Sequence, residues 1–171
     1  ARRRLLAGDY RAAERLCRQF LEADPHAAEA WSHLGEALHG QKRFTDAAAA
    51  LRRALGLRPH EPRWLLHLGA ALSRAGKPAE AVDALCQAVA LQPGLAEAHY
   101  QLGAALGRLG QADRAAESYR RAERGLPPDG AALTELGVAL ARLGLLAEAV
   151  DVLRRAVAVA PAFAKGHNNL G

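Results

Sequence analysis

Histidine is the residue type in this sequence best suited to acid–base chemistry or metal binding, and there are seven histidines. Two of them, His33 and His67, are 34 residues apart, so a fold that repeats at this period would give both the same orientation. Neighbouring helices lie about 8–10 Å apart, which makes a shared metal ion awkward. We find no acidic residue or cysteine that would complete the ligand set. The sequence therefore predicts no metal site and no cofactor.

The other histidines form no catalytic motif. "HEP", from His60 to Pro62, resembles the start of a zinc-binding HExxH, but the proline interrupts it. His26 and His60 lie beside prolines in expected turns, while His99 and His167 share a column that predicts partly buried rings. No Ser-His-Asp or paired-carboxylate arrangement can be argued from the spacing. We expect that this segment is not an enzyme.

Composition and charge exclude several other classes. The formal net charge is +5, from 23 basic and 18 acidic residues mixed along the chain, without the dense basic, aromatic-rich face typical of nucleic-acid binding. No apolar run is long enough for membrane insertion, and "ARRRLLAGDY" has no signal-peptide core. Cys17 and Cys86 are predicted to be buried or half-buried apolar groups and not a disulfide. These features favour a cytoplasmic protein.

A period of 34 residues organises the whole chain. Several residue types recur at this spacing, which is typical of stacked repeats. The prolines are Pro25, Pro59, Pro93, Pro127 and Pro161, and the alanines are Ala13, Ala47, Ala81, Ala115 and Ala149. Leucine fills one column, Leu34, Leu68, Leu102, Leu136 and Leu170, and bulky residues fill another, Cys17, Leu51, Leu85, Tyr119 and Leu153.

Each period reads as a pair of helices. The apolar columns are spaced three and four residues apart, in two groups separated by a break that carries Gly8, Gly76, Gly110 and Gly144. A proline follows the second group, where it ends the helix. A further glycine column, Gly35, Gly69, Gly103, Gly137 and Gly171, lies inside the first helix, where glycine costs about 1 kcal/mol relative to alanine. We expect these glycines to meet the alanine column where the two helices approach closely.

This pattern resembles the tetratricopeptide repeat family. The motif W-x2-L-G is present as Trp31, Leu34 and Gly35, and "GDYRAA" and "AEAWSHLGEAL" look like the family consensus. The resemblance covers the whole chain and implies an all-α, right-handed superhelical solenoid of antiparallel helix hairpins. It divides residues 1–171, as a single array, into a partial unit 1–27, full units 28–61, 62–95, 96–129 and 130–163, and a partial unit 164–171.

A few positions depart from the pattern. Phe20 replaces an alanine, which suggests contact with a preceding unit, and Gly125 suggests that its second helix ends early. The sequence also begins and ends within a first helix, without the polar caps expected at solenoid ends. We therefore expect the natural array to continue in both directions.

The resemblance implies that the first helix of each unit lines a concave groove. Family positions 5, 6, 9 and 13 map onto sixteen residues of this sequence, which we expect to bind a peptide. They are Ser32, His33, Glu36, Leu66, His67, Ala70, Arg74, Tyr100, Gln101, Ala104, Arg108, Glu135, Val138, Arg142, Asn168 and Asn169. The polar column at position 6 could hydrogen-bond a peptide backbone over a small apolar floor. The arginine row either favours an acidic partner or only keeps the surface soluble.

The resulting hypothesis is a scaffold that binds an extended or helical segment of another protein. The alternative is a substrate-recruiting module of a larger enzyme, such as a glycosyltransferase, sulfotransferase or hydroxylase. The array is similar to bacterial-type arrays attached to enzymes like the O-linked N-acetylglucosamine transferases, but only Asn169 matches their asparagine ladder, and the Lys and Asn of the chaperone carboxylate clamp are missing. Exposed apolar faces at the ends also predict end-to-end self-association.

Overall fold

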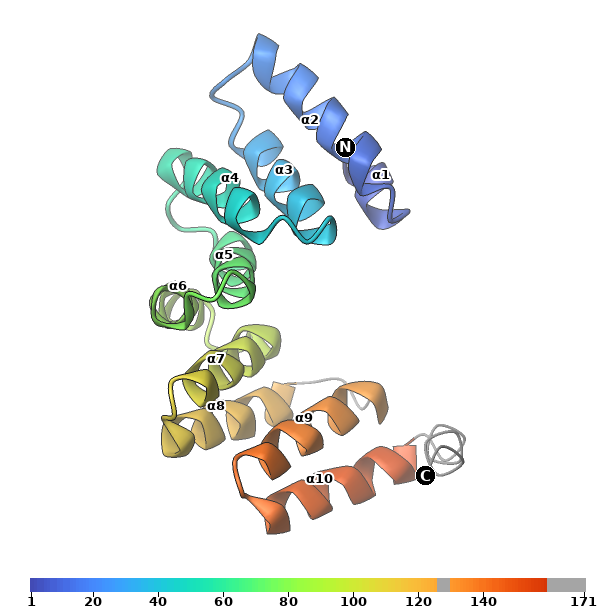
Figure 1. Ribbon diagram of the computed structural model, residues 1–171, viewed down its shortest axis with the longest axis vertical. Coiled ribbons are helices and arrows are strands. Elements are labelled where there is room, and N and C mark those ends of the chain that lie inside the picture. Colours follow the sequence, from blue (N-terminus) through green and yellow to red (C-terminus); the bar gives the residue numbers. More distant parts are fainter. Residues whose placement is uncertain (126–129, 160–171) are drawn as a thin grey trace. The chain divides into compact units, whose positions relative to one another are not determined.

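The computed structural model describes residues 1–125 and 130–159, except for the side chains of 131, 132 and 135. These residues form helices and no β-strand (Figure 1). Residues 1–93 form one compact unit, unit 1, and residues from 94 onward form a second, unit 2. The helices of unit 1 are α1 (Arg2–Leu6), α2 (Tyr10–Ala23), α3 (Ala28–Gly40), α4 (Phe44–Leu57), α5 (Pro62–Arg74) and α6 (Pro78–Leu91). Those of unit 2 are α7 (Ala96–Arg108), α8 (Ala112–Gly125), α9 (Gly130–Arg142) and α10 (Leu146–Val159).

Consecutive helices pair into hairpins, α3 with α4, α5 with α6, α7 with α8 and α9 with α10. Figure 1 shows the two helices of each hairpin side by side and antiparallel. The first helix of each hairpin begins at Ala28, Pro62, Ala96 or Gly130, and these are the first residues of the four full repeats expected from the 34-residue period. The predicted all-α fold is therefore confirmed, while the single array over residues 1–171 stays a prediction.

The turns that follow α1, α5, α7 and α9 share one backbone conformation. Gly8, Gly76, Gly110 and Gly144 have φ between 71° and 80°, the left-handed region that glycine enters without a steric penalty. The amide after each glycine bonds back to the helix, as in Lys77 N to Leu72 O at 2.9 Å, which closes the helix end. Lys42 takes the same place in the α3–α4 turn with φ 62°. A lysine therefore adopts a conformation that the other turns give to glycine.

The core of each hairpin is built from the apolar columns. The alanines Ala13, Ala47, Ala81 and Ala115 are fully buried, as are Leu51 and Leu85. Because they are fully buried, these alanines and leucines form the apolar face that each second helix packs against its neighbours. As predicted, Cys17 is a buried free thiol, Cys86 is half-buried, and His99 is a buried ring.

The glycine column packs differently from the prediction. Gly35, Gly69, Gly103 and Gly137 are buried, as expected, but the nearest side chain at each belongs to the bulky column of the second helix. At Gly137 the backbone oxygen of Ala149, from the alanine column, would also lie 3.4 Å from an added Cβ. A Cβ added at Gly35 would lie 2.6 Å from Leu51 Cγ, and one at Gly69 would lie 2.4 Å from Leu85 Cγ. The glycine therefore makes room for a large side chain. The missing Cβ of the glycine allows the large residue of the second helix to pack directly on the backbone of the first.

Two departures from the pattern have different outcomes. The prediction that Gly125 ends its helix early is wrong, because α8 ends at the same repeat position as α4 and α6. A Cβ at Gly125 would lie 3.0 Å from the Cβ of Ala96, so this glycine permits contact between α8 and the start of α7. Phe20 is 57% exposed, whereas Ala54 and Ala88 in its column are buried. The contact of Phe20 with a preceding repeat stays a prediction.

Candidate functional site

The first-helix residues of unit 1 bring a carboxylate and histidines together. His67 on α5 places Nδ1 3.4 Å from Oε1 of Glu36 on α3, within ion-pair distance when His67 is protonated, although Nδ1 makes no hydrogen bond within the described residues. Burial acts to raise the pKa of Glu36, but the contact and charge of His67, together with His33, hold this pKa below its usual value. Sequence reasoning missed this pair, because it considered His33 and His67 without the acidic residue one turn away.

His39 lies beside this pair and is poorly suited to carry a charge. Its Nε2 is buried without a hydrogen-bond partner within the described residues, and its ring packs edge-on against Phe44 at 5.2 Å. Burial lowers the pKa of His39, and the charges of His67 and Arg74 lower it further. His39 is therefore a neutral packing residue behind the predicted site.

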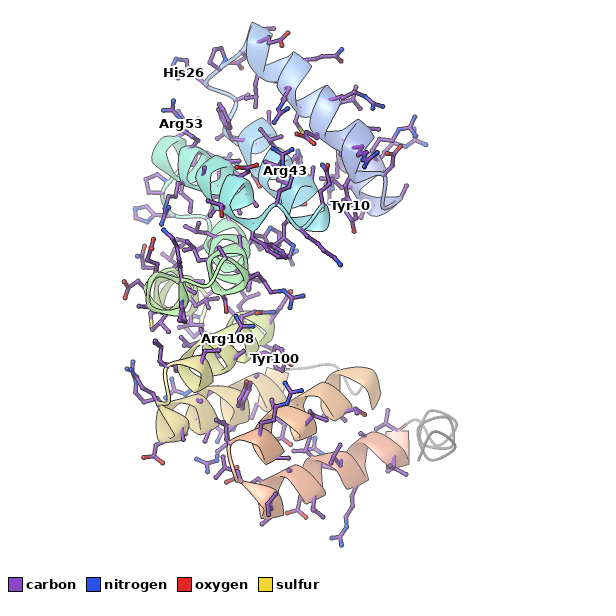
Figure 2. The ribbon with its side chains drawn as sticks, viewed as in Figure 1. Tyr10, His26, Arg43, Arg53, Tyr100 and Arg108 are labelled. Atoms are coloured by element: carbon purple, nitrogen blue, oxygen red, sulfur yellow. The ribbon has the colours of Figure 1, made fainter. Side chains whose placement is uncertain are left out.

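Two predicted groove residues of unit 1 offer no surface to a ligand. Ser32 and Leu66 are each only 2% exposed, so they support the surface from within. Ala70 is half-buried, and Arg74 is exposed with its guanidinium 5.8 Å from the ring centroid of Phe44. The arginine row would continue at Gly40, but the ring of Tyr10 covers the helix backbone at this position (Figure 2). A Cβ added at Gly40 would lie 2.5 Å from this ring.

The first-helix residues of unit 2 form a different surface, built around two tyrosines. Tyr100 on α7 packs against Tyr119 on α8, with ring centroids 5.6 Å apart. Tyr119 can occupy this place because Gly103 has no side chain, and an added Cβ would lie 2.7 Å from its ring. Tyr119 belongs to the bulky core column, so no sequence pattern indicated that it would support the site.

Two arginines of the predicted row act on Tyr119. The pKa of Tyr119 is raised to about 12, first by burial and then by Tyr100, against the opposing charges of Arg108 and Arg142. Figure 2 shows Tyr100 and Arg108 on the same helix, α7. Both arginines are exposed. This geometry makes a cationic, aromatic surface on α7 and α9 whose buried phenol, that of Tyr119, stays protonated at neutral pH.

The rest of the predicted unit 2 surface is small and partly apolar. Gln101 and Ala104 are half-buried, and Val138 is 42% exposed. Glu135 lies on α9, and its side chain is outside the described residues, as are Asn168 and Asn169. The predicted residues that are described and not buried therefore lie on two surfaces, one on unit 1 and one on unit 2.

These surfaces offer hydrogen bonds, charge and apolar contact. Among the described side chains, no group of three or more His, Cys, Asp or Glu is arranged to hold a metal ion. No described helix is both long enough and apolar enough to span a bilayer.

Comparison with known proteins decides the family. A model of the tetratricopeptide repeat matches in four overlapping windows, residues 1–62, 41–96, 66–129 and 100–165. The chain belongs to the tetratricopeptide repeat family. A search of curated proteins finds no match.

Solved structures of other tetratricopeptide repeat proteins are similar to this chain. A crystal structure of MamA is 29% identical, has a TM-score of 0.79 and covers 95% of each chain. MamA from Desulfovibrio magneticus RS-1 is 23% identical, with a TM-score of 0.79 over 92% of this chain and 89% of the other. YrrB, described as having an unusual peptide-binding site, is 24% identical, with a TM-score of 0.70 over 91% and 80%. This tetratricopeptide array is a protein-interaction scaffold.

Proposed function

We propose that the scaffold binds an extended acidic peptide on the first-helix surface of unit 2. The observation that carries this proposal is the packing of Tyr100 on Tyr119, together with the exposed Arg108 and Arg142, whose charges both act on Tyr119. Guanidinium groups bind carboxylates through paired, charge-assisted hydrogen bonds. The half-buried ring of Tyr100, supported from below by the buried Tyr119, gives the peptide a rigid apolar contact that loses little side-chain entropy on binding.

The neighbouring residues fit the same ligand. Gln101 can donate to and accept from a peptide backbone, so it would bind an extended segment largely regardless of sequence. Ala104 is small and Val138 is 42% exposed, which leaves room for a short apolar side chain of the peptide. YrrB, a tetratricopeptide repeat protein of similar fold with a peptide-binding site, supports the same class of ligand.

Charge reversal tests this proposal. The probe is a fluorescein-labelled acidic peptide, DEADLDED, titrated with the chain and followed by fluorescence polarisation. We expect Arg108→Glu/Arg142→Glu to weaken binding about tenfold or more. The control is Arg121→Glu/Arg124→Glu on α8, which changes the net charge equally and leaves the proposed surface intact. If both variants bind equally well, or lose affinity equally, the proposed site is wrong.

We further propose self-association through α10. Val150 and Val157 are 45% and 50% exposed and lie on one face of the helix, seven residues apart. The equivalent residues of α4, Ala48 and Leu55, are at most 9% exposed, and α4 packs against α5. An exposed apolar stripe of this kind favours contact with another chain.

Sedimentation at increasing protein concentration tests the second proposal. We expect Val150→Asp/Val157→Asp to remain monomeric at concentrations where the parent chain associates. Leu91→Asp is the control, because Leu91 is an exposed apolar residue on another second helix. A parent chain that stays monomeric throughout would exclude this proposal and leave the peptide-binding one intact.

A further inference from the structure

Unit 1 has two repeat-related grooves on the opposite side of its first helices from the predicted peptide surface. One, the α2–α4 groove, is bordered by α2 and α4 over α3 and has a volume of about 600 Å³. The other, the α4–α6 groove, is bordered by α4 and α6 over α5 and has a volume of about 460 Å³. Neither groove contains any residue predicted to bind a ligand. Apart from Arg43 and Pro59, their lining residues occupy equivalent places in the repeat, so most differences between the grooves come from side-chain identity.

The floors of both grooves are apolar, but only one carries an aromatic residue. Leu34 and Leu38 line the α2–α4 groove, as Leu68 and Leu72 line the α4–α6 groove. Trp31 completes the first floor. Its indole is held in place, since Nε1 donates a hydrogen bond to the carbonyl of Pro25 at 2.9 Å. A fixed indole offers a large apolar surface at little entropic cost.

The rims of the two grooves differ in the sign of their charge. Arginines line the α2–α4 groove at positions 18, 43 and 53 and carboxylates at 22 and 46, which gives 3 − 2 = +1. The α4–α6 groove has one arginine, at 52, and carboxylates at 80 and 83, which gives 1 − 2 = −1. The difference that matters for a ligand lies at Arg53, whose place in the second groove is taken by Gln87, so the first groove offers acidic groups a cation that the second lacks.

One arginine of the first groove is positioned to meet a ligand. Arg43 is already bound to Glu14 at 2.8 Å and Asp46 at 2.6 Å, and Arg18 is bound to Glu14 at 2.9 Å. Arg53 has no carboxylate partner within the described ranges. Its guanidinium lies 6.0 Å from the Trp31 ring centroid, and the side chain is exposed (Figure 2). An arginine held near an aromatic face keeps its hydrogen-bond donors available.

We propose that the α2–α4 groove is a second docking surface, for an acidic amphipathic segment of a partner protein. A leucine or phenylalanine of that segment packs on Trp31 and Leu34, and a neighbouring carboxylate binds Arg53. The mode is recognition of a short amphipathic segment in an apolar groove, with the charged rim selecting the partner. The proposal is independent of the surface on unit 2, so the scaffold would hold two ligands at once.

Trp31 itself reports occupancy of this groove. In a Trp64→Phe background it is the only tryptophan, since the chain has two. The probe is the peptide EDLLDFEE, titrated while the emission of Trp31 is recorded, with KKLLKFKK as the charge-reversed probe. We expect EDLLDFEE to shift the emission of Trp31, and KKLLKFKK to bind about tenfold more weakly or not at all.

Two adjacent arginines of α4 provide a matched pair of variants. Arg53→Gln should weaken binding of EDLLDFEE about tenfold, because the peptide loses its carboxylate partner. Arg52→Gln removes the same charge one residue away, but Arg52 lines the α4–α6 groove, so its affinity should stay within about twofold of the parent. Both positions are exposed, so folding, checked by circular dichroism, should be unchanged.

Each other outcome overturns the proposal. Equal affinity of Arg53→Gln and Arg52→Gln for EDLLDFEE would show that Arg53 is not the anchor. Equal affinity of the acidic and basic probes would show that the rim does not select by charge. Binding of EDLLDFEE detected by calorimetry without a change at Trp31 would place the ligand elsewhere, and loss of that binding in Arg108→Glu/Arg142→Glu would assign it to unit 2.

Discussion

The hairpins α3–α4 and α7–α8 have the same backbone arrangement, but the bulky core residue of the second helix has a different role in each. In each, a glycine of the first helix admits a large side chain of the second, Leu51 at Gly35 and Tyr119 at Gly103. Leu51 is fully buried and only fills the core. Tyr119 is also buried but contacts Tyr100 on the candidate surface. The repeat thus fixes where the glycine and its bulky partner lie, and the identity of the partner decides whether the contact serves packing alone or also a site.

The largest effect should come from closing the space at these glycines. An alanine at Gly35 or Gly103 would place its Cβ 2.6 Å from Leu51 Cγ or 2.7 Å from Tyr119 Cε1, so the partner must move. We expect each substitution to lower the free energy of unfolding by about 1–3 kcal/mol, despite the gain in helix propensity. Urea denaturation measures both. Gly103→Ala should in addition weaken binding of DEADLDED, because Tyr119 supports Tyr100.

A double-mutant cycle sharpens this prediction. In a Leu51→Ala background the clash is relieved, so Gly35→Ala should become neutral or stabilising by about 1 kcal/mol through helix propensity alone. A Gly35→Ala variant as stable as the parent chain would mean that the close approach of the two helices does not depend on the glycine.

The turns of the two hairpins are also held differently, which predicts a difference in acid sensitivity. Glu14 on α2 accepts hydrogen bonds from Gln41 at 2.7 Å and Arg43 at 2.8 Å in the α3–α4 turn. The α7–α8 turn has Leu109 and Gln111 at the equivalent positions. Burial acts to raise the pKa of Glu14, but the contacts with Gln41, Arg18 and Arg43 hold this pKa below its ordinary value of 4.5.

The sign of the pH effect follows from that lowered pKa. A carboxylate with a lowered pKa in the folded state contributes stability above its unfolded pKa and loses this contribution as the pH falls through the folded value. We expect Glu14→Gln to lower the free energy of unfolding by about 1–3 kcal/mol at neutral pH and by less at roughly pH 3. Thermal melting at both pH values measures this change. An equal loss at both would show that the Glu14 charge does not hold the turn.

The turn residue itself should give a smaller effect, of opposite sign in the two hairpins. Lys42 and Gly110 have φ 62° and 73°, and both turns are closed by a backbone hydrogen bond of 3.0 Å. Because a side chain is strained in this conformation, Lys42→Gly should stabilise the chain by about 1 kcal/mol and Gly110→Lys should destabilise it by about as much. Lys42→Ala separates conformation from charge. If it matches Lys42→Gly in thermal stability, strain at this position is not the cause.

The sequence predicted the fold well because the 34-residue period records which face of each helix is buried. The starts of the first helices at Ala28, Pro62 and Ala96 and the burial of Gly35 follow from that pattern. The partner of the glycine column did not follow. Helical spacing gives the direction of a side chain but not how far the opposing helix is rotated, and that rotation presents Leu51 to the glycine.

The candidate site was less predictable, since its properties depend on neighbours that are distant in sequence. Family position gave Ser32 and Leu66 the same role as Tyr100, but surrounding helices bury the first two. The Glu36–His67 contact joins residues 31 positions apart in sequence, and its effect on the pKa of Glu36 arises only when both helices are packed. Position in a repeat gives the direction of a side chain, whereas exposure and pKa depend on the assembled surroundings.

The smallest effect should come from glycines of the same two hairpins that face no close partner. A Cβ at Gly56, near the end of α4, would have no atom within 4 Å, and one at Gly107, near the end of α7, would lie 3.5 Å from Leu143 Cδ2, an ordinary contact. We therefore expect Gly56→Ala and Gly107→Ala to stabilise the chain by about 0.5–1 kcal/mol each, the propensity difference between the two residues. Urea denaturation should place these variants and Gly35→Ala on opposite sides of the parent chain. If all three substitutions changed the free energy of unfolding in the same direction, helix propensity, and not the side chain opposite each glycine, would determine the effect of substituting the glycine column.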